Sequence, residues 1–290
     1  MISVYLARYD DYIRTNEMLY HLKTEESLEE LTNMIISVLV NKYKMPINDL
    51  IMSILNAIKF NYGSTKLYIQ ILNHLSNEYQ IFSKRLLSIE VLDFASNYLK
   101  KDHTNNMINL WIETSSEALE VQEMIKNDDI QKFKVYALMK PITDISIAIP
   151  CFQSLSPIEA CCYFGSVNIF YYLKTNMNTK ITKKCIRYSF IGGNIAIINE
   201  CQVYHQIDKI CLKFIIYSHN ITYFEYILER FLSKINDFDL CDIVNSSNLK
   251  AMILFLAKHN NNVFSIDTIK RKIIRYTIQK NIKEIIELIL

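Results

Sequence analysis

The sequence predicts an all-α protein: an α-solenoid of stacked helix–turn–helix repeats preceded by a helical N-terminal region. The first observation is a short phrase, in which a small or polar residue is followed by Asn or Ser and then by an aliphatic residue. It begins at Gly165, Gly193, His219, Ser247 and Lys280. The spacings of 28, 26, 28 and 33 residues are those of one helical hairpin per repeat.

Two further observations support helices. Apolar residues recur seven, four and three positions before each turn, as Ile158, Cys161 and Cys162 do before Gly165, and this spacing marks one buried stripe of a helix. Only four Gly and four Pro punctuate the chain, too few for the turns of a β-rich or parallel α/β fold. The phrase therefore predicts the turn inside each helix pair. At its first position, His219 is expected in a left-handed or capping conformation.

The N-terminal region shows helical patterns without a clean repeat. Residues 4–22 form an amphipathic pattern, and Ser27 with Glu30 resembles a capping box that opens a second helix running to Val40. The acidic run 25–30 is then the solvated first turn of that helix.

Further helices follow in order. Pro46 precedes a third helix expected over Ile47–Phe60, and Gly63 ends it. Apolar stripes then run through 67–75 and 86–99.

The repeats are predicted to begin earlier than the first clear phrase. Val121, Met124 and Ile125 precede a turn at Asp128 with the same spacing. We therefore divide the chain into a lead-in over 1–116 and repeats over 117–290, with turns near 128, 165, 193, 219, 247 and 280. The irregular stretch 140–150, with two prolines, is the nearest candidate boundary inside this pattern.

The segment Ser156–Gly165 resembles the Thr-Pro-Leu-His-x-Ala-Ala-x-x-Gly opening of an ankyrin repeat, in which Pro157 would start the first helix and Cys161 and Cys162 would let helices approach closely. The longer stretch 156–231, with its Ile181-Thr182-Lys183-Lys184-Cys185 and Ser189-Phe190-Ile191-Gly192-Gly193-Asn194 segments, is similar to a divergent ankyrin-like family of unknown function expanded in parasitic protists, and 41–46 resembles the lead-in of that family. The resemblance implies a binding scaffold with no known reaction.

The sequence departs from the ankyrin pattern at the β-hairpin finger that connects one repeat to the next. A full repeat of about 33 residues includes a β-hairpin finger, whereas spacings of 26 to 28 leave too few residues for one. The His of the opening is replaced by Glu159, Arg187, Lys213 and Cys241. We therefore expect the fingers to be absent or very short.

The repeat geometry predicts a contact surface on the first helices. In stacked repeats, residues that flank the buried stripe of each first helix line one face, and aromatic and Arg side chains suit interfaces. The candidate partner contacts are Glu159, Tyr163, Arg187, Lys213 and Tyr217. The expected function is a non-catalytic protein–protein interaction scaffold with an unidentified protein partner.

A structural or self-associating module is the alternative function. The chain ends within an apolar stripe at Leu288 and Leu290, where a free solenoid would need a polar cap. This end is the expected site of self-association, or of continuation into a longer repeat array.

Charge and hydropathy argue against nucleic-acid and membrane partners. The net charge is +2, and the densest basic cluster, 270–272, fits a solvated helix face. The longest uncharged runs, 145–158 and 160–173, are shorter than a span of about 20 apolar residues. Arg8 and Asp10 interrupt any apolar signal core. The expected location is cytoplasmic or nuclear.

No cofactor, metal or catalytic constellation is predicted. The seven cysteines (Cys151, Cys161, Cys162, Cys185, Cys201, Cys211 and Cys241) lack zinc-ligand spacing and are expected as buried free thiols. Cys201 and His205 are four residues apart, the best nucleophile-and-base pair available, but they lack a third group. The Gly192-Gly193 pair is interpreted as only a turn, and the chain is not expected to be an enzyme.

Overall fold

The computed structural model describes residues 2–79, 116–142, 144–149, 152, 154–230 and 240–258. Within these ranges every regular element is a helix, and the one extended pairing is an isolated antiparallel bridge between Ile147 and Leu155. The predicted all-α class is therefore confirmed. The chain divides into two compact units, Thr104–Asn220 and Met1–His103 with Ile221–Leu290. The repeat spacing alone does not predict a division at Asn220.

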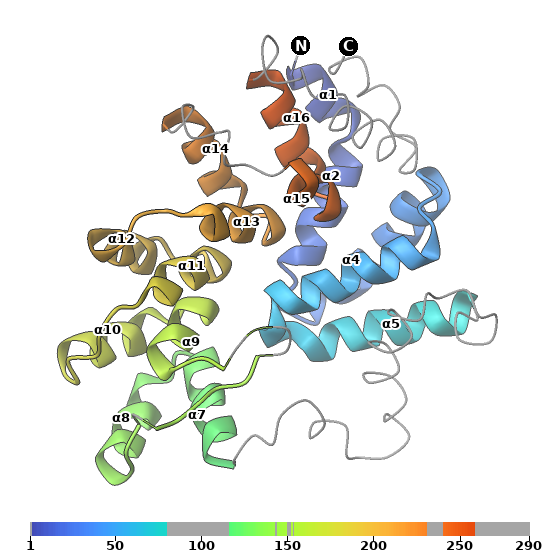
Figure 1. The fold of residues 1–290 in the computed structure, drawn as a ribbon. Coiled ribbons are helices and arrows are strands. Elements are labelled where there is room, and N and C mark those ends of the chain that lie inside the picture. Colours follow the sequence, from blue (N-terminus) through green and yellow to red (C-terminus); the bar gives the residue numbers. More distant parts are fainter. Residues whose placement is uncertain are drawn as a thin grey trace. The chain divides into compact units, whose positions relative to one another are not determined.

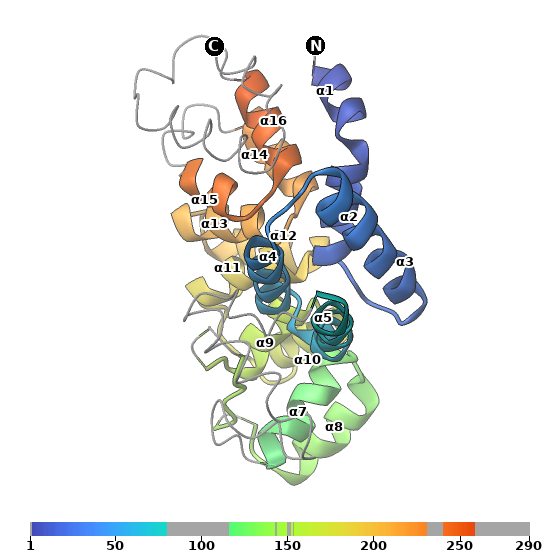
Figure 2. The same cartoon turned by 90° about the vertical axis from the view of Figure 1, so that its right-hand side faces the viewer.

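The unit Thr104–Asn220 consists of helix pairs joined by short turns (Figure 1). The first helix of each pair contacts the first helix of the next, and α8, α10 and α12 contact one another in the same order. The pairs follow one another in sequence order in both views (Figures 1 and 2). The helices of this unit are α7 (Ser116–Lys126), α8 (Ile130–Met139), α9 (Pro157–Phe164), α10 (Val167–Thr175), α11 (Lys183–Gly192), α12 (Ile195–Tyr204) and α13 (Lys209–Tyr217).

A left-handed residue lies at each predicted turn within the described ranges. The φ angles are 50° at Asp128, 77° at Gly165, 68° at Gly193, 55° at His219 and 57° at Ser247. Glycine adopts this conformation at no steric cost, and a residue in this conformation commonly ends a helix. The left-handed conformation expected for His219 is confirmed.

Side chains of three turns bond to the end of the first helix in the preceding pair. The Asn194 amide donates to the Gly165 carbonyl oxygen at 3.3 Å, and the Asn220 amide donates to the Phe190 carbonyl oxygen at 3.1 Å. The Ser166 hydroxyl donates to the carbonyl oxygen of Ile125. These bonds satisfy carbonyl groups near helix ends that have no partner within their own helix.

The closest helix contact lies between α9 and α11. A Cβ built on Gly192 would lie 2.2 Å from the Cys162 carbonyl oxygen and 2.7 Å from the Gly165 amide nitrogen. Gly192 is thus the site of a close backbone approach, which corrects its interpretation as part of a turn only. Gly193 is the left-handed residue that ends the helix.

The core of this unit lies between the two rows of helices. One aromatic side chain from each successive pair is fully buried, and burying each such side chain contributes about 1.5–3 kcal/mol. They are Phe133 on α8, Phe170 on α10 and Phe190 on α11. Isoleucines of α12 complete this apolar layer.

The other unit combines the N-terminal helices with the last described pairs (Figures 1 and 2). Its α16 contacts both α1 and α14. Its elements are α1 (Ile2–Arg8), α2 (Asp10–Tyr20), α3 (Glu26–Met34), the π-helix η1 (Ile35–Lys42), α4 (Ile47–Phe60), the 3₁₀ turn η2 (Tyr62–Ser64), α5 (Thr65–Tyr79), α14 (Ile221–Arg230), α15 (Leu240–Asn245) and α16 (Leu249–Lys258).

Long-range polar contacts tie the N-terminal helices to α15 and α16. The Lys250 ammonium lies 3.1 Å from the Glu17 carboxylate, and the Tyr20 hydroxyl donates to the Ser246 carbonyl oxygen at 3.3 Å. Within the N-terminal region itself, the Tyr68 hydroxyl of α5 donates to the Leu19 carbonyl oxygen of α2 at 2.6 Å. The N-terminal region and α14–α16 therefore share one core.

Two N-terminal expectations need correction, and one is confirmed. The helix expected over 4–22 is two helices that meet at Tyr9. The Ser27 hydroxyl donates to the Thr24 carbonyl oxygen at 3.0 Å, and α3 begins at Glu26, so the predicted capping box is wrong. The helix expected over Ile47–Phe60 is observed with those bounds.

Several predicted features lie outside the described residues. They are the stripe 86–99, the turn near 280, the basic cluster 270–272, Cys151, and the apolar end at Leu288 and Leu290.

Candidate interaction face

The first helices α9, α11 and α13 each begin at a polar cap. The Ser156 amide donates to the Glu159 carboxylate at 3.0 Å, as expected from a capping box. The Thr182 hydroxyl oxygen accepts from the Lys184 amide at 3.2 Å, and the Asp208 carboxylate accepts from the Cys211 amide at 2.9 Å. These caps fix where each first helix starts, and therefore which residues face outward.

Each of the later caps also bonds to the first helix before it. The Thr182 hydroxyl donates to Glu159 of α9 at 2.8 Å, and Arg187 of α11 donates through its Nε to Asp208 at 2.8 Å. Burial alone would raise the pKa of Asp208. The hydrogen bonds from Arg187 and from the Cys211 amide outweigh burial, and the net pKa lies below its usual value. A charged Asp208 therefore both caps α13 and pairs with α11.

The five predicted contact residues differ in how far they are buried. The side chains of Glu159 and Tyr163 are buried, with 6% and 3% of their surface exposed. Arg187 and Tyr217 are half-buried, and Lys213 is exposed, with its ammonium 5.5 Å from the Tyr217 ring centroid. The expectation that all five line an open surface is thus wrong for Glu159, which caps and links helices, and for Tyr163.

Tyr163 is buried because an aromatic cluster covers it. The Phe152 ring centroid lies 5.8 Å from that of Tyr163, 5.6 Å from that of Tyr188 and 5.6 Å from that of Phe214. The Tyr188 and Phe214 rings are nearly parallel, with 18° between their planes and centroids 5.8 Å apart. Burial raises the pKa of Tyr188, and the nearby Glu159 charge adds to this effect.

Sequence reasoning missed this cluster. Phe152 lies between the irregular stretch 140–150 and α9, where no helical period was recognised. Tyr188 and Phe214 occupy the same repeat position, 26 residues apart, and this recurrence of an aromatic residue was the available signal.

The exposed part of the face is basic. Residues 183–192 and 208–217 carry five basic side chains and one acidic side chain, in a chain whose net charge is only +2. The acidic one, Asp208, is paired with Arg187. Lys183, Lys209 and Lys213 are exposed. The outward side of α11 and α13 thus combines positive charge with aromatic surface.

The cysteines of the helix pairs are buried thiols. Cys161, Cys162, Cys185, Cys201 and Cys211 are free and buried, whereas Cys241 is only partly buried. Burial raises the pKa of Cys161 and Cys162, and raises that of Cys211 to about 12. The Cys185 pKa is lowered, because the hydrogen bond with the Cys162 thiol outweighs burial.

We expect this burial to set thiol reactivity. With Ellman's reagent near pH 8, Cys161, Cys162 and Cys211 should react only as fast as the protein unfolds, because both burial and a raised pKa suppress the attacking thiolate. Cys241 should react faster. Peptide mapping by mass spectrometry after timed quenching measures each rate, and fast labelling of Cys162 in folded protein would contradict the prediction.

Cys201 and His205 make different contacts in the structure. The Cys201 side chain is fully buried. The His205 Nε2 lies 3.0 Å from the Ile181 carbonyl oxygen. Over the residues that the structure describes, no group of three or more His, Cys, Asp or Glu side chains is arranged to hold a metal ion.

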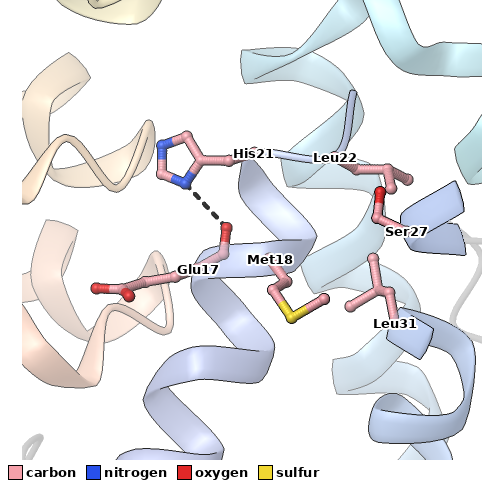
Figure 3. A pocket seen from close by; sticks show the side chains of 6 residues that line it. All are labelled: Glu17, Met18, His21, Leu22, Ser27 and Leu31. Carbon is pink, nitrogen blue, oxygen red and sulfur yellow. Dashed lines mark hydrogen bonds between the residues drawn. The ribbon is translucent and has the colours of Figure 1, made fainter. Parts of the chain in front are cut away.

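A small open pocket of about 300 Å³ lies in the other unit (Figure 3). The His21 Nδ1 approaches the Glu17 carbonyl oxygen at 2.9 Å, and the Glu17 carboxylate pairs with Lys250. Ser27 bonds to the Thr24 backbone. Because these polar groups are already engaged, the pocket is a weaker candidate than the first-helix face. The lining residues are Glu17, Met18, His21, Leu22, Ser27 and Leu31.

None of the helices described here is both long enough and apolar enough to span a membrane.

Comparison with known proteins shows a family match over part of the chain. A family model described as a domain of unknown function (DUF3447) matches residues 177–255, from the residues before α11 into α16. No curated protein and no solved structure matches the chain. The chain is therefore similar, from α11 into α16, to a domain whose function is not known.

Proposed function

We propose that this chain is a non-catalytic protein-interaction scaffold, built as a stack of degenerate ankyrin-like repeats, that binds a protein partner through the outward side of α11 and α13. The observation that carries the proposal is the recurrence of basic and aromatic residues at equal repeat positions, beside the exposed Lys183, Lys209 and Lys213. Arg187 and Lys213 share one such position, and Tyr188 and Phe214 share the next. Aromatic and Arg side chains dominate the energetics of protein interfaces.

The packing of the helix pairs supports a rigid platform. First helices are linked through the Thr182–Glu159 and Arg187–Asp208 contacts, and the turns are linked through Asn194. Since each repeat contacts only its neighbours in such arrays, these links keep outward residues of successive helices in register. A preorganised face loses less entropy when a partner binds.

The test is capture by the immobilised full chain. We expect Lys183→Glu, Lys213→Glu and Tyr217→Ser together to abolish capture of a protein that the unaltered chain binds, because the combination removes the net positive charge of the face and an aromatic contact. Helicity should be unchanged and the melting temperature should fall only slightly, since both lysines are exposed and Tyr217 is half-buried.

The matched control lies on the second helices. Ile195→Ser with Val203→Ser alters α12 residues that are 61% and 75% exposed, and it should leave capture intact. If the first-helix variant retains the captured protein while the α12 variant loses it, the binding face is not the one proposed.

A further inference from the structure

Phe152 places an aromatic ring on the same face that the proposed function assigns to a partner. It makes edge-to-face contacts with Tyr188 and Phe214, with ring planes at 90° and 88°. Such contacts contribute beyond the burial of apolar area. Three first helices are joined by this one ring, because Tyr163 lies on α9, Tyr188 on α11 and Phe214 on α13.

The base of the loop is held by contacts that do not involve the Phe152 ring. Ile147 and Leu155 exchange two backbone hydrogen bonds, each of 2.8 Å, and both side chains are fully buried. Ile149 is also fully buried. The Phe152 side chain, in contrast, is only half-buried. The ring can therefore leave the cluster without loss of the contacts that anchor the loop.

The surroundings of the ring define what could replace it. An incoming group must supply an aromatic ring for contact with Tyr188 and Phe214. It would then lie beside the basic outward side of α11 and α13, where the one acidic side chain, Asp208, already pairs with Arg187. Acidic residues next to the incoming ring would complement this charge.

We propose that Phe152 is an internal stand-in for a partner's aromatic side chain, and that a partner segment carrying an aromatic residue between acidic residues binds by displacing it. This rests on the proposed function and names the chemistry of its partner. In the free protein the Phe152 ring occupies the place of the partner's aromatic ring. The free protein therefore binds the partner more weakly than a chain without this ring would.

The test uses a fluorescein-labelled probe peptide, Glu-Asp-Phe-Asp-Glu, and the full chain. Phe152→Ala should bind the probe about tenfold more tightly than the unaltered chain, because the competing ring is gone. Replacing the probe's Phe by Ala, or its acidic residues by Lys, should remove the gain. The control Val203→Ala, on exposed α12 surface, should bind as the unaltered chain does.

Amide hydrogen exchange shows whether the loop stays in place. The Ile147 and Leu155 amides should remain protected in Phe152→Ala. If that variant unfolds, Phe152→Leu keeps apolar bulk without a ring, and it should show a smaller gain of the same sign. Equal affinity of the probe for altered and unaltered chains, or a gain that persists with the Ala or Lys probe, would overturn the proposal.

Each of the two proposals can be refuted without refuting the other. If the probe shows no ring-dependent gain while the first-helix variant still loses its captured protein, the stand-in is wrong and the scaffold remains. If Phe152→Ala binds the probe more tightly while the first-helix variant still captures the protein, the face assigned to the scaffold's partner is wrong.

Discussion

Replacing Gly192 by Ala should destabilise the unit Thr104–Asn220 by about 3 kcal/mol or more, even though Ala is the better helix former. In an exposed helix interior the same change stabilises by about 1 kcal/mol. Here the new Cβ would lie 2.2 Å from the Cys162 carbonyl oxygen and 2.7 Å from the Gly165 amide nitrogen. Both are backbone atoms, so α9 and α11 must separate to admit one methyl group.

Urea unfolding followed by circular dichroism measures the effect, and Gly193→Ala is the matched control. The nearest atom to a Cβ at Gly193 is the Asn220 Nδ2, at an ordinary 3.8 Å. That variant should lose only about 1–2 kcal/mol, the cost of a left-handed conformation for a residue with a Cβ. A neutral or stabilising Gly192→Ala would show that α9 and α11 do not approach this closely.

The parts of the fold that local signals determine could be predicted from the sequence. Pro46 and the apolar stripe after it were enough for the helix Ile47–Phe60, because capping and periodicity act within a few residues. The turns at Gly165 and Gly193 were equally local. The role of Gly192 was not, because it depends on the distance to Cys162 in another helix.

The candidate face was predicted in part for the same reason. Helical periodicity predicted Arg187, Lys213 and Tyr217 on the outward side of their helices, and in the structure Lys213 is exposed whereas Arg187 and Tyr217 are half-buried. It could not show that Glu159 and Tyr163 are covered, because Phe152 covers Tyr163 from a loop that has no period. An irregular segment carries no pattern from which its packing partner can be inferred.

Replacing Asp128 by Ala should lower the free energy of unfolding by about 2–3 kcal/mol. The carboxylate accepts from the Asn168 amide at 3.0 Å, from the Asn168 side chain at 2.8 Å and from the Ile169 amide at 3.0 Å. It therefore caps α10 from the preceding helix pair, while the hydroxyl of Ser166, the residue that precedes α10, bonds to Ile125 instead. Hydrogen bonds to a charged acceptor are the stronger kind.

The neighbouring residue provides the control that separates this role from ordinary capping. Asp129 caps its own helix α8 by accepting from the Lys132 amide at 3.1 Å, and Asp129→Ala should lose clearly less stability than Asp128→Ala. Asp128→Gly relieves the left-handed φ of 50° but removes the same three bonds, so it should remain clearly destabilised. If Asp128→Gly is as stable as the unaltered chain in urea, the stability lost in Asp128→Ala comes from the left-handed backbone and not from the three missing hydrogen bonds. If it is not, the carboxylate joins α7 and α8 to α10, and an acidic residue at a turn stabilises the next helix pair rather than its own.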